Sequence, residues 1–210
     1  MLAWQRFRRN IITYMSIAIV MWGIMPFIFE GMERLIESEA ERAYGCMLFM
    51  QVVFPVIALM VPMTYSLEDV AGIGCELLYV GDRVKAYKYI ASYVIYAVLA
   101  YPLYVYASGT CCLYNYRWEY IRGLIIIAFL YGIYYLIIYA TGNYLVAIVS
   151  ICAYIVYSAF TENDGSRLKF VNACFADQAL IEEWYIPFLC VGIIALLAGV
   201  LFNDRFEKFN

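Results

Sequence analysis

The sequence predicts an all-α, polytopic membrane protein with six transmembrane helices in a single domain, residues 1–210. The first observation is composition: 66% of the residues are hydrophobic and the mean hydropathy is +0.75, whereas a soluble domain is about 45 to 50% apolar. The second observation is that apolar residues form six runs, each near the roughly 17 to 25 residues that a membrane-spanning helix needs. The predicted spans are residues 11–29, 44–65, 90–107, 123–140, 144–160 and 185–202.

Two of the six runs differ from the others, because the first stands at the N-terminus like a signal peptide and the fourth nearly fuses with the fifth. We expect residues 11–29 to remain as helix one, because no small-x-small cleavage pattern follows them. The fourth and fifth runs nearly fuse, but a helix of about 40 residues would be twice as long as the ~30 Å hydrocarbon layer is thick. The chain must therefore turn between them, and Thr141-Gly142-Asn143 are the turn-forming residues available there.

The distribution of lysine and arginine predicts the orientation of the helices. With both termini in the cytoplasm, eight of these residues lie inside and six outside. The six outside are Arg34, Arg42, Arg117, Arg122, Arg167 and Lys169. Because basic residues beside the first helix usually dominate, Arg6, Arg8 and Arg9 favour this orientation. We expect a multi-pass protein of a bacterial plasma membrane. Its first outer connection, Glu30 to Arg42, is strongly acidic, and we interpret it as a solvated helical face.

The inner connection between the second and third runs carries a helical pattern. Ser66 and Asp69 match the S-x-x-[DE] signal of a helix start. A break at Gly81 precedes Asp82, which is a good N-cap residue for the next helix. Between them runs an apolar stripe at helical spacing, formed by Val70, Ile73, Leu77 and Val80. The pattern predicts a short amphipathic helix at the cytoplasmic surface, hinged at Gly81 to the third span.

The same segment carries a resemblance to a known family. Its residues are Glu68, Gly72 or Gly74, Glu76-Leu77-Leu78, Val80-Gly81, Asp82-Arg83, Lys85 and Lys88. They resemble the connection between helices two and three of type-2 ABC transporter permeases, where an acid, a glycine, Glu-Leu-Leu, a proline-containing break and Ser-Arg precede a lysine-bearing helix. Gly81 and Asp82 depart from the proline and serine of the family. The six spans and the longer loop before the last helix also agree with this family.

The resemblance implies the permease subunit of an ABC exporter, without a catalytic residue, metal or cofactor of its own. In this family the segment is a coupling helix that docks on a separate ATPase subunit, which holds ATP and Mg. The docking residues implied here are Glu68, Asp69, Val70, Ile73, Glu76, Leu77, Leu78, Asp82 and Arg83. A second permease subunit, identical or different, would complete the transporter. The alternative is an ordinary interfacial loop whose bases satisfy the positive-inside rule.

A candidate translocation path is formed by polar and amphipathic side chains within the spans. Its residues are Gln51, Tyr89, Tyr93, Tyr96 and Tyr134. Each tyrosine offers an apolar ring and a polar tip, which suits an amphipathic or lipophilic substrate such as a peptide, drug or lipid-like molecule. Helix packing and anchoring at the membrane interface explain the tyrosines equally well, and Gln51 is also typical of a residue that ties two helices together.

The sequence lacks residues that several classes of membrane protein need for their function. The chain has no histidine, which disfavours Ser-His and His-zinc membrane proteases, and the six runs contain no charged residue. No GxxxxGK[ST] phosphate loop occurs, so energy for transport must come from a partner. One small basic cluster does not indicate nucleic acid. The rival interpretations are a non-transporting multi-pass protein, such as an immunity or regulatory partner, and a membrane enzyme.

Two features concern the predicted outer face. Four of the seven cysteines lie at or near it: Cys46, Cys111, Cys112 and Cys174. A disulfide between Cys174 and another of them, or free thiols throughout, both fit the sequence. In the outer connection from Thr161 to Trp184, residues 179–184 are expected to form a short interfacial helix before the last span.

Overall fold

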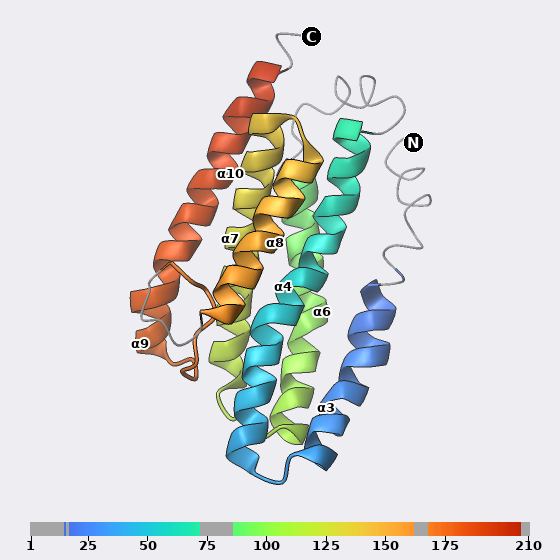
Figure 1. The fold of residues 1–210 in the computed structure, drawn as a ribbon, viewed down its shortest axis with the longest axis vertical. Coiled ribbons are helices and arrows are strands. Elements are labelled where there is room, and N and C mark those ends of the chain that lie inside the picture. Colours follow the sequence, from blue (N-terminus) through green and yellow to red (C-terminus); the bar gives the residue numbers. More distant parts are fainter. Residues whose placement is uncertain (1–14, 16, 72–85, 162–167, 207–210) are drawn as a thin grey trace.

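The computed structural model describes residue 15 and residues 17–71, 86–161 and 168–206 as a bundle of long helices (Figure 1). Within these residues there is no strand, which confirms the all-α prediction for the described part of the chain. In chain order the elements are η1 (Val20–Ile24), α3 (Met25–Leu35), α4 (Glu39–Ala71), α6 (Ala86–Thr110), α7 (Tyr116–Thr141), α8 (Tyr144–Phe160), α9 (Gln178–Leu180), η2 (Ile181–Tyr185) and α10 (Ile186–Phe206).

The long helices alternate in direction along the bundle (Figure 1). We call the end with the connection between α7 and α8 the turn end. The opposite end, which we call the loop end, carries residues 36–38, 111–115 and 168–177. Four helical stretches are long and apolar enough to cross a membrane, namely Glu39–Leu67, Ala86–Thr110, Tyr116–Thr141 and Gln178–Asn203. Helix α8 is apolar but shorter. Each of the six predicted spans coincides with a helix in its described part.

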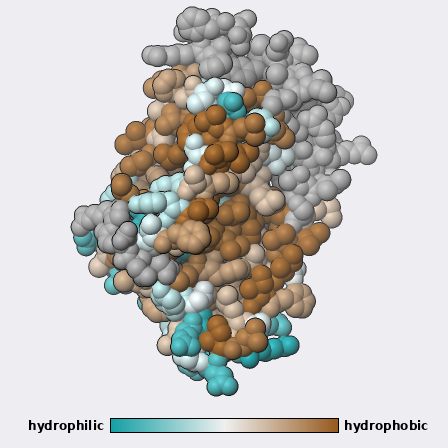
Figure 2. Space-filling view, viewed as in Figure 1, coloured by the Kyte–Doolittle hydropathy of each residue, from teal (hydrophilic) through white to brown (hydrophobic). Residues whose placement is uncertain are grey.

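Apolar side chains cover the outer faces of α6 and α10. Val98 is 68% exposed and Leu201 is 67% exposed, although both are aliphatic. Figure 2 shows apolar residues across the middle of one face and hydrophilic residues at its lower end. An apolar exterior of this kind is typical of a helical bundle that lies in a bilayer.

Helix α7 forms the centre of the bundle and contacts α4, α6, α8 and α10. Its approach to α10 is closest at Gly132 and Gly192. A Cβ at Gly132 would overlap the carbonyl oxygen of Gly192, and a Cβ at Gly192 would lie 2.6 Å from the Cα of Phe129. Small residues allow membrane helices to pack backbone against backbone, and these two glycines make that contact possible.

The turn between α7 and α8 confirms its prediction. Gly142 has a φ of 63°, in the left-handed region that glycine adopts without strain. Asn143 then caps α8, because its Oδ1 accepts hydrogen bonds from the backbone N–H groups of Leu145 at 2.9 Å and Val146 at 3.5 Å.

The acidic segment after the first predicted span is largely a solvated helical face, as expected. Helix α3 continues to Leu35 and α4 begins at Glu39, so residues 36–38 alone separate them. Glu39 and Glu41 belong to the first turn of α4, where the helix dipole favours acidic side chains. The predicted outer loop from Glu30 to Arg42 is therefore mostly helical.

The predicted helix start at Ser66 is wrong. Helix α4 passes through this position without interruption and ends at Ala71. The Ser66 hydroxyl donates to the carbonyl of Met63 at 2.9 Å and also pairs with the Tyr134 hydroxyl. A serine inside a helix can form such a bond to an earlier carbonyl, and the sequence motif does not distinguish this use from capping.

A tyrosine of α7 helps to keep α4 continuous past Pro62. Proline has no backbone N–H, so a proline inside a helix leaves the carbonyl four residues earlier without its usual hydrogen-bond donor. For Pro62 this carbonyl is that of Ala58. The Tyr131 hydroxyl donates to that oxygen at 2.6 Å. The neighbouring helix therefore supplies the missing hydrogen bond, because backbone polar groups within a bilayer must be hydrogen-bonded inside the protein.

Candidate functional site

Residues 168–177 fold back against the loop end of the bundle and are held there by four polar side chains, three of which are buried. Phe170 and Ala176 are fully buried, so the segment packs against the helices. The side chains that bind its backbone from α4 and from the start of α7 are Gln51, Asn115, Glu119 and Arg122. We call these four residues, together with residues 168–177, the loop clamp.

Glu119 and Arg122 form a buried ion pair at the base of α7. Their side chains are 3% and 0% exposed. The second carboxylate oxygen of Glu119 accepts from the backbone N–H of Ala176 at 2.7 Å, and Arg122 Nη1 donates to the carbonyl of Cys174 at 2.9 Å. The guanidinium also lies 5.7 Å from the centre of the Tyr185 ring. Both charges are paired with each other and with the loop, which is the condition under which buried charges are tolerated.

The amide of Gln51 binds the same loop from α4. Its Nε2 donates to the carbonyl of Asn172 at 3.0 Å, and its Oε1 accepts from the backbone N–H of Asn172 at 2.9 Å. Asn115 adds a bond from its Nδ2 to the carbonyl of Ala176 at 3.2 Å. Two helices therefore hold the loop through its backbone, and the loop's own side chains contribute little to these bonds.

Aromatic side chains anchor the first half of the loop. Tyr154 on α8 donates to the carbonyl of Leu168 at 2.7 Å, and Tyr185 in η2 donates to the carbonyl of Phe170 at 2.8 Å. The indole of Trp184 donates to the carbonyl of Lys169 at 3.3 Å. These bonds satisfy backbone groups of a buried segment that belongs to no helix.

Replacing Gln51 with leucine should release part of the loop clamp. The change keeps a side chain of similar size but removes both bonds to Asn172, and each buried bond lost destabilises by about 1 to 3 kcal/mol. We expect hydrogen exchange at the Asn172 amide to become at least about tenfold faster. Gln178→Leu is the matched control, because Gln178 is exposed and bonds Glu182 only within α9 and η2. Equal exchange in both variants would contradict the role assigned to Gln51.

The sequence did not predict the buried charges of this site. Arg122 and Lys169 are expected at the outer surface from the orientation argument, yet both are buried. Helix α7 begins at Tyr116, before the predicted span, and this extension carries Glu119 and Arg122 into the bundle. Their three-residue spacing was the available signal, but it is equally typical of an exposed ion pair.

The expected short helix before the last span is present as part of a longer one. Helix α9 begins at Gln178, and Asp177 caps it by accepting from the backbone N–H of Leu180 at 2.7 Å. The π-helical turn η2 then leads directly into α10. This continuity places Trp184 and Tyr185 against the loop clamp.

The tyrosines of the candidate path lie among α4, α6 and α7. Tyr96 donates to the carbonyl of Phe54 at 3.2 Å, and Tyr134 pairs with Ser66. Tyr89 packs edge-on against Tyr135, with ring centres 4.8 Å apart. Tyr89, Tyr96 and Tyr134 are buried within the chain.

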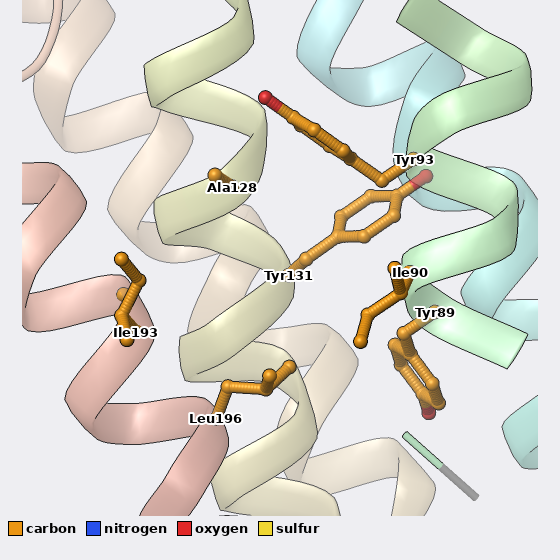
Figure 3. A pocket seen from close by; sticks show the side chains of 8 residues that line it. Tyr89, Ile90, Tyr93, Ala128, Tyr131, Ile193 and Leu196 are labelled. Carbon is orange, nitrogen blue, oxygen red and sulfur yellow. The ribbon is translucent and has the colours of Figure 1, made fainter. Parts of the chain in front are cut away.

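Tyr93 lies beside a small apolar groove between α6, α7 and α10 (Figure 3). The groove has a volume of about 120 Å³. Its lining residues are Tyr89, Ile90, Tyr93, Ala128, Tyr131, Gly192, Ile193 and Leu196. The Tyr93 hydroxyl donates to the carbonyl of Leu124 at 3.2 Å, so its ring closes one side of the groove in a fixed orientation.

The proposed docking residues are only partly within the described residues. Glu68, Asp69 and Val70 belong to the last turns of α4, and Val70 packs against the core. Those outside the described residues are Ile73, Glu76, Leu77, Leu78, Asp82 and Arg83. Lys88, from the same polar segment, is largely buried in the first turn of α6.

The cysteines outside residues 72–85 are free thiols. They are Cys46, Cys111, Cys112, Cys152, Cys174 and Cys190. Cys174 is exposed while Cys46 and Cys111 are fully buried, so the disulfide considered for Cys174 is absent among the described residues.

Comparison with protein-family models, with curated proteins and with solved structures found no match to this chain.

Proposed function

We propose that the chain is the membrane-spanning permease subunit of an ATP-driven ABC exporter. It moves an amphipathic or lipophilic substrate, such as a peptide, drug or lipid-like molecule, across the plasma membrane. A separate ATPase subunit holds ATP and Mg and supplies the energy, and a second permease subunit completes the path. This chain carries out no catalytic step itself.

The continuity of α4 supports this proposal most directly. The helix has 33 residues, so it is about 50 Å long. Its last turns contain Glu68 and Asp69, with which the segment resembling a coupling helix begins. Closer to its other end, Gln51 holds the backbone of Asn172 in the loop clamp. One helix therefore joins the proposed docking segment to the loop at the opposite end of the bundle.

In the proposed mechanism, ATP-driven closure of the partner presses on residues 68–83 and displaces α4. Because helices are stiff along their length, the displacement reaches Gln51 and strains its bonds to Asn172. Movement of α4 away from α7 separates Gln51 from Glu119 and Arg122, which hold the other half of the loop. The loop clamp then opens and exposes the outer end of the path.

The test is co-purification of this chain with whichever ABC ATPase is encoded nearest to it in the genome. The variant is Glu76→Arg, which reverses the charge of a proposed docking residue. We expect wild type to retain the ATPase and the variant to lose at least about 90% of it, because a reversed charge at a docking surface adds repulsion to the lost attraction. The control is Glu37→Arg, an exposed acid at the loop end, far from the docking segment.

The measurement distinguishes the proposal from its rival. Both variants must insert and elute as folded protein, and only Glu76→Arg should lose the ATPase. If wild type binds no ATPase, or if both variants bind it equally well, residues 68–83 are an ordinary interfacial loop. A non-transporting regulatory role would then be the better interpretation.

A further inference from the structure

The apolar groove between α6, α7 and α10 opens toward the outside of the bundle (Figure 3). Ile90 on α6 and Ile193 on α10 line it, and they are 52% and 50% exposed. Two small residues, Ala128 of α7 and Gly192 of α10, also line it and leave space between the larger side chains. The groove is therefore a recess in the exterior surface and not a cavity of the core.

The helices that line the groove are held in place by direct contacts with α7. The Tyr93 hydroxyl binds the carbonyl of Leu124, which fixes α6 to α7 beside the groove. On the other side, α10 packs backbone against backbone on α7 at Gly132 and Gly192. The groove therefore has its shape before any occupant arrives, and a preformed site lowers the ordering cost of binding.

The lining of the groove offers no polar partner to an occupant. None of its eight residues is a lysine, an arginine or an acid. The hydroxyls of Tyr93 and Tyr131 already donate to backbone carbonyls, and Tyr89 is fully buried. A polar occupant would lose its hydrogen bonds to water and gain none here. The lining is therefore complementary to a neutral hydrocarbon chain.

The groove lies halfway along α7. Ala128 is 12 residues after the start of this helix and 13 residues before its end, so it is roughly 20 Å from both ends. A bilayer has a hydrocarbon layer of ~30 Å, so the middle of a spanning helix is about 15 Å from either layer of headgroups. Lipid acyl chains are the component of a bilayer that reaches this depth.

The size of the groove also selects its occupant. Its volume is about 120 Å³, slightly less than the ~150 Å³ of an engineered protein cavity that holds one benzene molecule. It therefore has room for a chain segment of about five carbon atoms. A helix of a second copy is about 10 Å wide and does not fit, and a stable dimer needs about 800 Å² of contact from each partner.

We propose that the groove binds one acyl chain of a bilayer phospholipid. The bound chain lies against α6, α7 and α10 together, whereas a lipid beside a single helix touches one surface only. The additional van der Waals contacts hold it longer than the surrounding lipids. This site depends on the bundle lying in a bilayer, but it does not depend on an ATPase partner or on transport.

The experiment reconstitutes the purified full-length chain into phosphatidylcholine vesicles. A small fraction of the lipid carries a photoreactive diazirine near the methyl end of one acyl chain. After illumination, mass spectrometry compares labelling at Ile90 and Ile193 with labelling at Val156. Val156 on α8 is the matched reference, because it is 53% exposed, lies at a similar height and is not among the residues that line the groove.

We expect labelling at Ile90 and Ile193 to exceed labelling at Val156 by at least about threefold, because a chain in contact with three helices stays longer. Ala128→Phe places a ring in the groove and should bring this ratio to about one while labelling at Val156 stays the same. Ala91→Phe is the control, because Ala91 is exposed on α6 and is not one of the lining residues. It should keep the ratio of the wild type.

The labelling map of the wild-type chain does not require any variant to fold. Equal labelling at all three positions would show that lipid only surrounds the bundle, and it would overturn the proposal. Weaker labelling at Ile90 and Ile193 than at Val156 would show that another protein surface, such as a second copy, covers the groove. An unchanged ratio in Ala128→Phe would overturn the assignment to this groove.

Discussion

Replacing Arg122 with leucine is expected to lower the free energy of unfolding by about 3 to 5 kcal/mol. The substitution removes the partner of Glu119, whose carboxylate is 3% exposed and would remain buried without its counter-ion. It also removes the bond to the carbonyl of Cys174 and the contact with the Tyr185 ring. Reversible unfolding of the detergent-solubilised chain measures the loss.

The same helix offers a matched control for this prediction. Arg117 is exposed and bonds only the neighbouring Tyr116 hydroxyl, so Arg117→Leu should change stability by less than about 0.5 kcal/mol. Replacing Glu119 and Arg122 together by leucine should recover much of the loss, because no unpaired charge then stays buried. Equal effects of Arg122→Leu and Arg117→Leu would show that the ion pair does not hold the loop.

Replacing Gly132 with alanine is the second change with a large expected effect. A Cβ there would overlap the carbonyl oxygen of Gly192, and backbone cannot yield as a flexible side chain does. Helices α7 and α10 must separate, and overpacking of this kind destabilises by about 1 to 3 kcal/mol or more. We expect about 3 kcal/mol, measured by the same unfolding transition.

Gly45→Ala on α4 is the control for this substitution. A Cβ at Gly45 would have no heavy atom within 4 Å, so the change adds helix propensity without a clash. It should leave stability unchanged or raise it by up to about 1 kcal/mol. If Gly132→Ala were as stable as Gly45→Ala, the close contact between α7 and α10 would not exist as described.

The sequence did not predict which role the tyrosines have. Their number and spacing left a translocation path and helix packing as equal alternatives. In the structure the hydroxyls of Tyr93, Tyr96 and Tyr131 donate to backbone carbonyls of neighbouring helices. The partner of such a hydroxyl lies on another helix, so no local pattern identifies it. The free carbonyl that Pro62 leaves at Ala58 was the one clue available, because it requires a donor from elsewhere.

The burial of the charged residues in the loop clamp could not be predicted from the local sequence either. Glu119 and Arg122 stand at the polar edge of an apolar run, where a charged residue is usually solvated. Their burial depends on residues 174–176, which are more than fifty positions away in the sequence. Ser66 is a similar case, because its motif fits both a helix start and the interior of α4.

The sequence by itself determined the helical class, the approximate position of the apolar helices and the turn at Gly142 and Asn143. These features depend on the hydrophobicity and the backbone preferences of neighbouring residues, which are local properties. The tertiary structure decided how far each helix extends, which polar groups are buried and what they bind. Those outcomes depend on whether a distant segment supplies the partner that a buried polar group needs, and only the folded chain brings Glu119, Arg122 and Gln51 to the same loop.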